Sequence, residues 1–183
     1  VDAEIELLRR MGGAFRTNFV VGRTRKLLDL LEKDGYDAIF VGSGAGLPIF
    51  AGIPGEDLVG VFSANEYLTR ANMMGAIHPG RTDTPMYSSR RTVVLGGGNV
   101  AMDSCRMALR LGAEEVVVLY RRSRAEMPAR AEEVEHALEE GVQIRFLENA
   151  VAVLGDEKGR VRGVTVQRYQ LGEPDASGRR SPV

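Results

Sequence analysis

The chain has 183 residues, of which 44% are hydrophobic, and a net charge of −1 at pH 7. This length accommodates one ordinary domain or two small ones, and the apolar content excludes wholesale disorder. The near-neutral charge argues against a general nucleic-acid or membrane surface. The single cysteine, Cys105, excludes a disulfide framework and any iron–sulfur cluster held by this chain alone. No apolar run reaches transmembrane length and no signal peptide is visible, so a cytoplasmic location is expected.

The first half predicts two helices and two strands. Apolar residues recur at helical spacing over Asp2–Met11 and Thr24–Lys33, and Ala14–Val21 is strand-like. Tyr36–Val41 is a nearly continuous apolar run, which is typical of a strand buried on both faces. A glycine-rich loop, Gly42–Pro48, follows that strand.

A capping box, Ser63-Ala64-Asn65-Glu66, predicts a helix that runs to about Met74. Gly75–Ser89 contains two prolines and has no clear period, so we interpret it as a linker between two halves. The chain begins with Val1 and ends with Ser181–Val183 after a polar loop. We therefore expect a piece of a longer protein whose last residues follow a loop rather than an element.

The second half alternates strands and helices. Strands are predicted over Arg91–Leu95, Glu115–Tyr120 and Val142–Leu147, helices over Val100–Leu111 and Ala129–Glu140, and an antiparallel hairpin over Ala150–Leu154 and Val161–Leu171. This order predicts a parallel sheet with right-handed crossovers. The expected class is α/β, a three-layer Rossmann-like domain that ends in a β-hairpin.

The segment Thr92–Asp103 carries a dinucleotide fingerprint, Gly96-x-Gly98-x-x-Ala101, between a predicted strand and a predicted helix. Gly96 permits a tight turn out of the strand, and Gly98 lets a pyrophosphate approach the backbone. Ala101 is small enough for the helix to pack close to the strand. The helix N-terminus offers free N–H groups and a positive dipole end to phosphates.

About twenty residues later the chain reads Tyr120-Arg121-Arg122-Ser123-Arg124, where an NAD-binding protein carries an acidic residue for the ribose 2′-hydroxyl. Arginines at this place suit a 2′-phosphate, so we predict an NADP(H) site. The alternatives are a plain strand–helix turn and a solvated basic rim. The predicted NADP(H) contacts are Gly96, Gly97, Gly98, Asn99, Val100, Ala101, Arg121, Arg122 and Arg124.

The other chemistry-bearing residues give little signal. The loop at Gly42–Gly46 is a weak mononucleotide motif, because Pro48 and Pro54 prevent a regular helix after it. Cys105 lies on an apolar helix face and is expected to be a packed core thiol. No metal-ligand spacing and no nucleophile–base pair stands out, so no catalytic residue is named.

The combined motifs resemble the NADPH-dependent glutamate synthase small (β) subunit family over nearly the whole chain. The resemblance rests on the segments at 36–48, 52–56, 63–68, 96–103 and 120–129. The resemblance implies that residues 1–80 are a partial FAD-binding domain and that 88–175 are the NADP(H)-binding Rossmann domain. It also implies that Gly44, Ala45 and Gly46 contact FAD.

The family's cysteine-rich iron–sulfur region and its earlier FAD glycine fingerprint are missing from this sequence. The chain is therefore expected to be an internal piece of a flavoprotein that, alone, holds no FAD and is inactive. In the whole enzyme NADPH would pass a hydride to FAD, and clusters would carry electrons to a large subunit or another acceptor.

Two other hypotheses stay open: a non-catalytic NADP-binding or sensing module, and an electron-transfer docking subunit with no bound nucleotide. A reductase for a different acceptor, ferredoxin or sulfide, is a further variant of the flavoprotein interpretation. Because Tyr36–Val41 would be an interior strand without neighbours, the chain is also expected to form a homodimer, swap elements or fold this half back.

Overall fold

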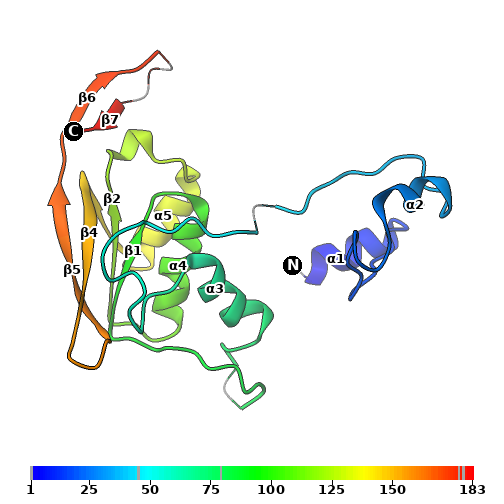
Figure 1. The fold of residues 1–183 in the computed structure, drawn as a ribbon, viewed down its shortest axis with the longest axis horizontal. Coiled ribbons are helices and arrows are strands. Elements are labelled where there is room, and N and C mark those ends of the chain that lie inside the picture. Colours follow the sequence, from blue (N-terminus) through cyan, green and yellow to red (C-terminus); the bar gives the residue numbers. More distant parts are fainter. Residues whose placement is uncertain (1, 45, 79, 177, 179) are drawn as a thin grey trace. The chain divides into compact units, whose positions relative to one another are not determined.

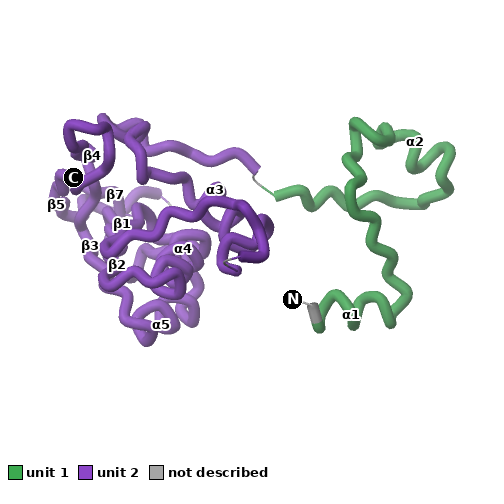
Figure 2. Tube along the Cα trace, turned by 90° about the horizontal axis from the view of Figure 1, so that it is seen from below, with its two compact units in different colours: residues 1–44 green, residues 45–183 purple. Residues whose placement is uncertain are grey.

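A computed structural model describes residues 2–44, 46–78, 80–176, 178 and 180–183. The chain divides into two compact units, Val1–Gly44 and Ala45–Val183, which Figure 2 shows in different colours. The division into an FAD part, 1–80, and an NADP(H) part, 88–175, concerns cofactors rather than contacts and stays a prediction.

The first unit contains two helices, α1 (Asp2–Arg10) and α2 (Leu27–Glu32). Both were predicted, but α2 is shorter than Thr24–Lys33. The reason is a turn before it, in which the Gly22 N–H donates to the Arg25 carbonyl at 2.7 Å. None of the described side chains in this unit is buried.

The two strands predicted in this unit are wrong. Ala14–Val21 and Tyr36–Val41 form no ladder, and the bridge between Val21 and Arg25 is the unit's single described strand-like pairing. A strand requires a neighbour to satisfy its backbone N–H and C=O groups, and the described residues supply none. The apolar pattern of Tyr36–Val41 remains, but Phe40 is 95% exposed.

The second unit is built on a parallel sheet of β1 (Arg91–Leu95), β2 (Glu115–Tyr120) and β3 (Gln143–Phe146), in that order. The crossovers are α4 (Asn99–Arg110) and α5 (Ala131–Glu139). These five elements confirm the predicted alternation.

Three layers result from the alternation of side chains along β2 (Figure 1). Val116 and Val118 pack with α4 and α5 into one core cluster. Val117 and Leu119 face the other way, against Ala150. The third layer is the antiparallel pair β4 (Glu148–Gly155) and β5 (Val161–Arg168), as predicted.

The predicted helix after Ser63 is present as α3 (Ala64–Leu68), continued by the π-helical η1 (Thr69–Met73). Its cap forms, with the Glu66 N–H donating to Ser63 Oγ at 3.2 Å. Gly75–Ser89, expected as a linker, lies inside the second unit. Thr84 Oγ1 bonds the Met74 carbonyl at 2.9 Å there.

The end of the chain differs from the prediction. A short hairpin of β6 (Leu171–Pro174) and β7 (Arg180–Pro182) forms where we expected one long strand and an irregular tail. Gln170 and Val183 exchange two backbone hydrogen bonds of 2.9 and 2.8 Å, which extend the ladder at the open end of the hairpin. The two strands are only four and three residues long, and the polar residues around them indicated a loop. No helix among the described residues is both long and apolar enough to cross a bilayer.

Candidate nucleotide site

The glycine loop leaves β1 and lies against the end of β2. The Gly96 N–H donates to the Leu119 carbonyl at 3.1 Å, and Gly96 has φ of 125°, a conformation that favours glycine. A Cβ on Gly97 would lie 2.6 Å from Tyr120 Cδ2, so only glycine fits at this position beside the ring of Tyr120. A Cβ on Gly98 would meet open space. Gly98 is thus the position where a ligand can approach the backbone.

The N-terminus of α4 is uncapped. Gly98 precedes the helix with φ of −90° and ψ of 173° and has no side chain to cap it. The N–H groups of Ala101 and Met102 bond back to the Gly98 carbonyl at 3.0 and 3.2 Å. Within the described ranges, the N–H groups of Gly98, Asn99 and Val100 have no protein acceptor. Unbonded amides at the positive end of a twelve-residue helix suit an anion.

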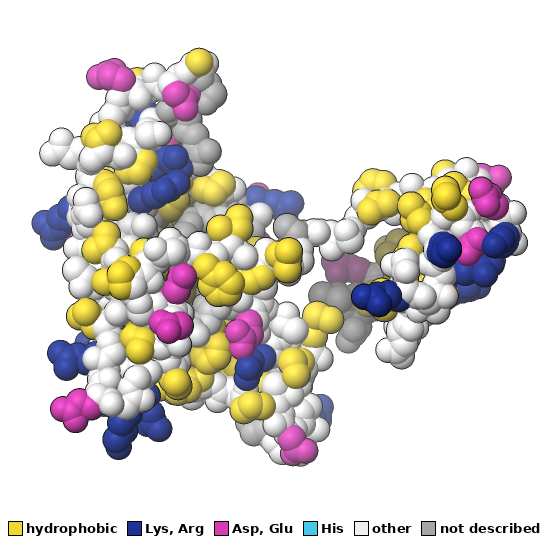
Figure 3. Space-filling view, in the orientation of Figure 1, with side chains coloured by type: hydrophobic (Ala, Val, Ile, Leu, Met, Phe, Trp, Pro, Cys, Tyr) yellow, Lys and Arg dark blue, Asp and Glu magenta, His cyan; other side chains and the backbone are white. Residues whose placement is uncertain are grey.

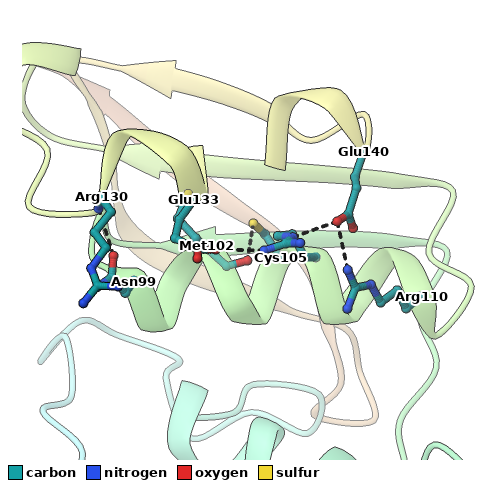
Figure 4. A network of polar contacts seen from close by, with 8 residues as sticks. Asn99, Met102, Cys105, Arg110, Arg130, Glu133 and Glu140 are labelled. Carbon is teal, nitrogen blue, oxygen red and sulfur yellow. Dashed lines mark hydrogen bonds and ion pairs between the residues drawn. The ribbon is translucent and has the colours of Figure 1, made fainter. Parts of the chain in front are cut away.

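Two hydrogen bonds join this loop to the segment before α5. The Ala129 N–H donates to the Gly97 carbonyl at 3.0 Å. The Arg130 N–H donates to Asn99 Oδ1 at 2.9 Å, as Figure 4 shows. The side chain of Asn99 therefore fixes the start of α5. The backbone N–H of Asn99 takes no part in this contact. Ala101 is buried, as its small size predicts, whereas Val100 is exposed.

The three predicted arginines follow β2 but have different surroundings. Arg121 is exposed, and among the described residues it has no hydrogen-bond or ion-pair partner. Arg122 is 8% exposed, and its Nε donates to the Arg180 carbonyl at 2.9 Å. Arg124 forms an ion pair with Glu135. Arg121 is therefore the guanidinium that is ready to bind an anion.

The sequence reasoning missed the residues that shape this arginine loop. Ser123 caps the short 3₁₀ helix η2 (Arg124–Glu126) in a complete capping box with Glu126. The pattern Ser-x-x-Glu was readable in the sequence. Glu126 also pairs with Arg180 of β7, at 2.7 Å from Nη2 to Oε1, and no local signal pointed to that contact.

The glycine loop that was predicted to contact FAD is exposed where the structure describes it. Gly44 and Gly46 are exposed, and Gly44 has φ of 69°. Ala45 lies outside the described residues, so FAD contacts at this loop stay a prediction.

Cys105 is fully buried, and burial raises the pKa of its thiol to about 11. It is an unreactive core thiol, as expected.

Comparisons with known proteins show the family to which this chain belongs. Residues 12–175 match the family described as pyridine nucleotide-disulphide oxidoreductase. The chain is 42% identical over 182 residues to the NADP(+)-dependent formate dehydrogenase subunit beta of Moorella thermoacetica. It is 41% identical over 178 residues to the glutamate synthase [NADPH] small chain of Escherichia coli. These alignments cover 98% and 96% of this chain but only 24% and 37% of the two relatives.

Among solved structures, FprA of Mycobacterium tuberculosis in complex with NADPH has the same fold. The TM-score is 0.67 at 23% identity, over 91% of this chain and 49% of that one. The expected α/β fold and the resemblance to glutamate synthase small chains are both confirmed. The chain belongs to the pyridine nucleotide-disulphide oxidoreductase family.

Proposed function

We propose that this chain is the NADPH-binding part of a flavin-dependent oxidoreductase similar to the glutamate synthase small chain. The relatives support the choice of coenzyme, since they include a glutamate synthase [NADPH] small chain and an NADPH-Fe(3+) oxidoreductase subunit of Geobacter sulfurreducens. Those names also denote small chains or beta subunits. We therefore propose a partner subunit for the whole protein, with FAD and iron–sulfur clusters in its other parts.

The proposal rests on one observation: two groups that are each suited to bind an anion lie at the same edge of the sheet. The carboxyl ends of β1 and β2 are adjacent, because Leu95 pairs with Leu119. The first end leads to the uncapped amides of α4, and the second leads to Arg121, which has no partner in the part of the chain that the structure describes. A dinucleotide with a 2′-phosphate has a pyrophosphate for the amides and a phosphate monoester for the guanidinium.

These residues would hold the coenzyme in the following way. The amides of Gly98, Asn99 and Val100 would bind pyrophosphate oxygens, and Arg121 and Arg122 would bind the 2′-phosphate. NADPH, when bound, supplies the hydride for the flavin. The described residues contribute position and charge, which is the usual contribution of a protein to hydride transfer.

Calorimetry with NADPH and NADH tests the proposal. Each charge-assisted hydrogen bond contributes roughly 1.5–3 kcal/mol, so NADPH should bind on the order of a hundredfold more tightly than NADH. Arg121→Ala should weaken NADPH at least tenfold, by the same estimate, and leave NADH unchanged. Arg91→Ala is the matched control, because Arg91 is exposed at the opposite end of β1.

Equal affinities for the two nucleotides would overturn the proposal. So would an equal loss of NADPH binding in Arg91→Ala and Arg121→Ala, since only general electrostatic attraction would then be at work.

A further inference from the structure

The arginine loop contains a carboxylate that a phosphate site should not tolerate. Glu126 ends η2, and its side chain is only 11% exposed. Its Oε2 accepts hydrogen bonds from the Ser123 N–H, at 3.1 Å, and from Ser123 Oγ. These bonds, together with the guanidinium of Arg180, lower the pKa of Glu126, so it is ionised at neutral pH. An unneutralised negative charge here would repel a 2′-phosphate and compete for Arg121 and Arg124.

A residue far along the chain neutralises this charge. Arg180 of β7 places Nε 2.9 Å and Nη2 2.7 Å from Oε1 of Glu126. The carbonyl of Arg180 also accepts the hydrogen bond from Arg122 Nε. Within the described ranges, the two terminal nitrogens of Arg122 have no protein acceptor. One residue thus holds both the acidic group and a basic group of the loop.

A further bond keeps the loop fixed on the sheet. The hydroxyl of Tyr120 donates to the Glu126 carbonyl at 2.6 Å, and the ring of Tyr120 packs on Gly97. The glycine loop, the arginine loop and β7 are therefore connected through Tyr120, Glu126 and Arg180.

We propose that Arg180 is a positioning residue whose side chain sets the preference for NADPH over NADH by neutralising Glu126, next to the point where its backbone carbonyl holds the guanidinium of Arg122. This inference rests on the proposed function. It assigns to the β6–β7 hairpin a role in coenzyme choice, with no contact to the coenzyme required.

The test measures the ratio of NADH to NADPH dissociation constants in the full chain. Arg180→Gln keeps a hydrogen-bonding side chain but removes the charge, and should lower the ratio about tenfold by weakening NADPH alone. Arg180→Lys should retain most of the ratio, because it restores the charge. The double variant E126Q/R180Q should recover the ratio to within about threefold, because the repelling charge is also removed.

The outcomes separate this inference from the proposed function. If the unaltered chain does not prefer NADPH, the proposed function fails. If it does, and Arg180→Gln leaves the ratio unchanged or weakens both nucleotides equally, Arg180 is merely structural and the inference is overturned. If the double variant stays as low as Arg180→Gln, neutralisation of Glu126 is not the cause. Should Arg180→Gln alone not fold, the comparison of E126Q with E126Q/R180Q decides, since the inference expects ratios within threefold of each other.

Discussion

At the residue scale, two neighbouring glycines have opposite requirements. A Cβ on Gly97 would penetrate the ring of Tyr120, which is 6% exposed and anchored through its hydroxyl. A Cβ on Gly98 meets nothing within 4 Å, and its backbone is extended. The first glycine is therefore required for packing, and the second is the one that our proposed site needs so that a pyrophosphate can approach the backbone.

We predict that Gly97→Ala lowers the free energy of unfolding by about 1–3 kcal/mol, the usual result of overpacking. Gly98→Val should leave stability nearly unchanged but abolish NADPH binding, because its side chain would occupy the place of the pyrophosphate. Urea denaturation and calorimetry measure the two effects, with Gly98→Ala as the smaller control. Normal NADPH binding by Gly98→Val would show that the nucleotide does not lie on this loop.

The fingerprint alone could not distinguish these two glycines. The spacing Gly96-x-Gly98 indicated the turn and the open position, but the role of Gly97 depends on a ring that lies 23 residues later. Likewise the run Arg121–Arg124 indicated a basic loop. Its members differ because their partners, Glu135 and Arg180, come from other elements. Local patterns predict which residues gather at a site, whereas tertiary contacts decide which are free.

At the element scale, α4 and α5 are joined by a polar network (Figure 4). Arg106 Nη1 lies 2.8 Å from Glu133 and its Nε 2.8 Å from Glu140, and Arg110 also reaches Glu140 at 2.9 Å. Both helices begin at the candidate site, so this network holds their spacing. Burial alone would raise the pKa of Glu140, but the hydrogen bonds from Arg106 and Arg110 outweigh it and keep that pKa below its usual value.

We predict that Arg106→Met lowers the free energy of unfolding by about 1–2 kcal/mol, because it removes the cation that faces the partly buried Glu133 and leaves Glu140 with Arg110 alone. Arg110→Met is the matched control and should cost less, since Arg110 is more exposed and has one partner among the described residues.

The depressed pKa of Glu140 means that the folded state binds fewer protons than the unfolded state in acid. The stabilisation is therefore complete above the ordinary Glu pKa, about 4.3, and is lost as the pH falls below it. Urea denaturation between pH 7 and 3 should show a smaller acid loss in Glu140→Gln; an equal loss would contradict the role of this pair.

The elements that the sequence predicted well are those whose partners are close along the chain. β1, α4, β2 and α5 satisfy one another within successive crossovers, and their bounds agree with the apolar pattern. Tyr36–Val41 has an equally strong strand pattern, but no described strand lies beside it. Hydrophobic periodicity predicts what a segment could bury, and a partner must still be present for a strand to form.

At the scale of the whole molecule, burial is concentrated in the second unit. Val116 and Val118 of β2 are 1% and 0% exposed, whereas no described side chain of residues 3–44 is buried. Apolar side chains are visible on the surface in Figure 3, and Phe40 is among the most exposed large ones. Stability should therefore differ sharply between the two units.

We predict that amide hydrogen exchange is slow in β2 and fast throughout residues 3–44, because few buried contacts oppose local opening there. Mass spectrometry of peptides from the exchanged chain measures both.

The expected homodimer is tested by the same measurement at several protein concentrations. If Tyr36–Val41 pairs with a second copy, the protection of its amides must rise with protein concentration. Phe40→Lys should then remove that rise while leaving β2 protected. Protection of this segment that is strong at every concentration, and unchanged in Phe40→Lys, would show that the first unit is stable by itself, contrary to the burial pattern.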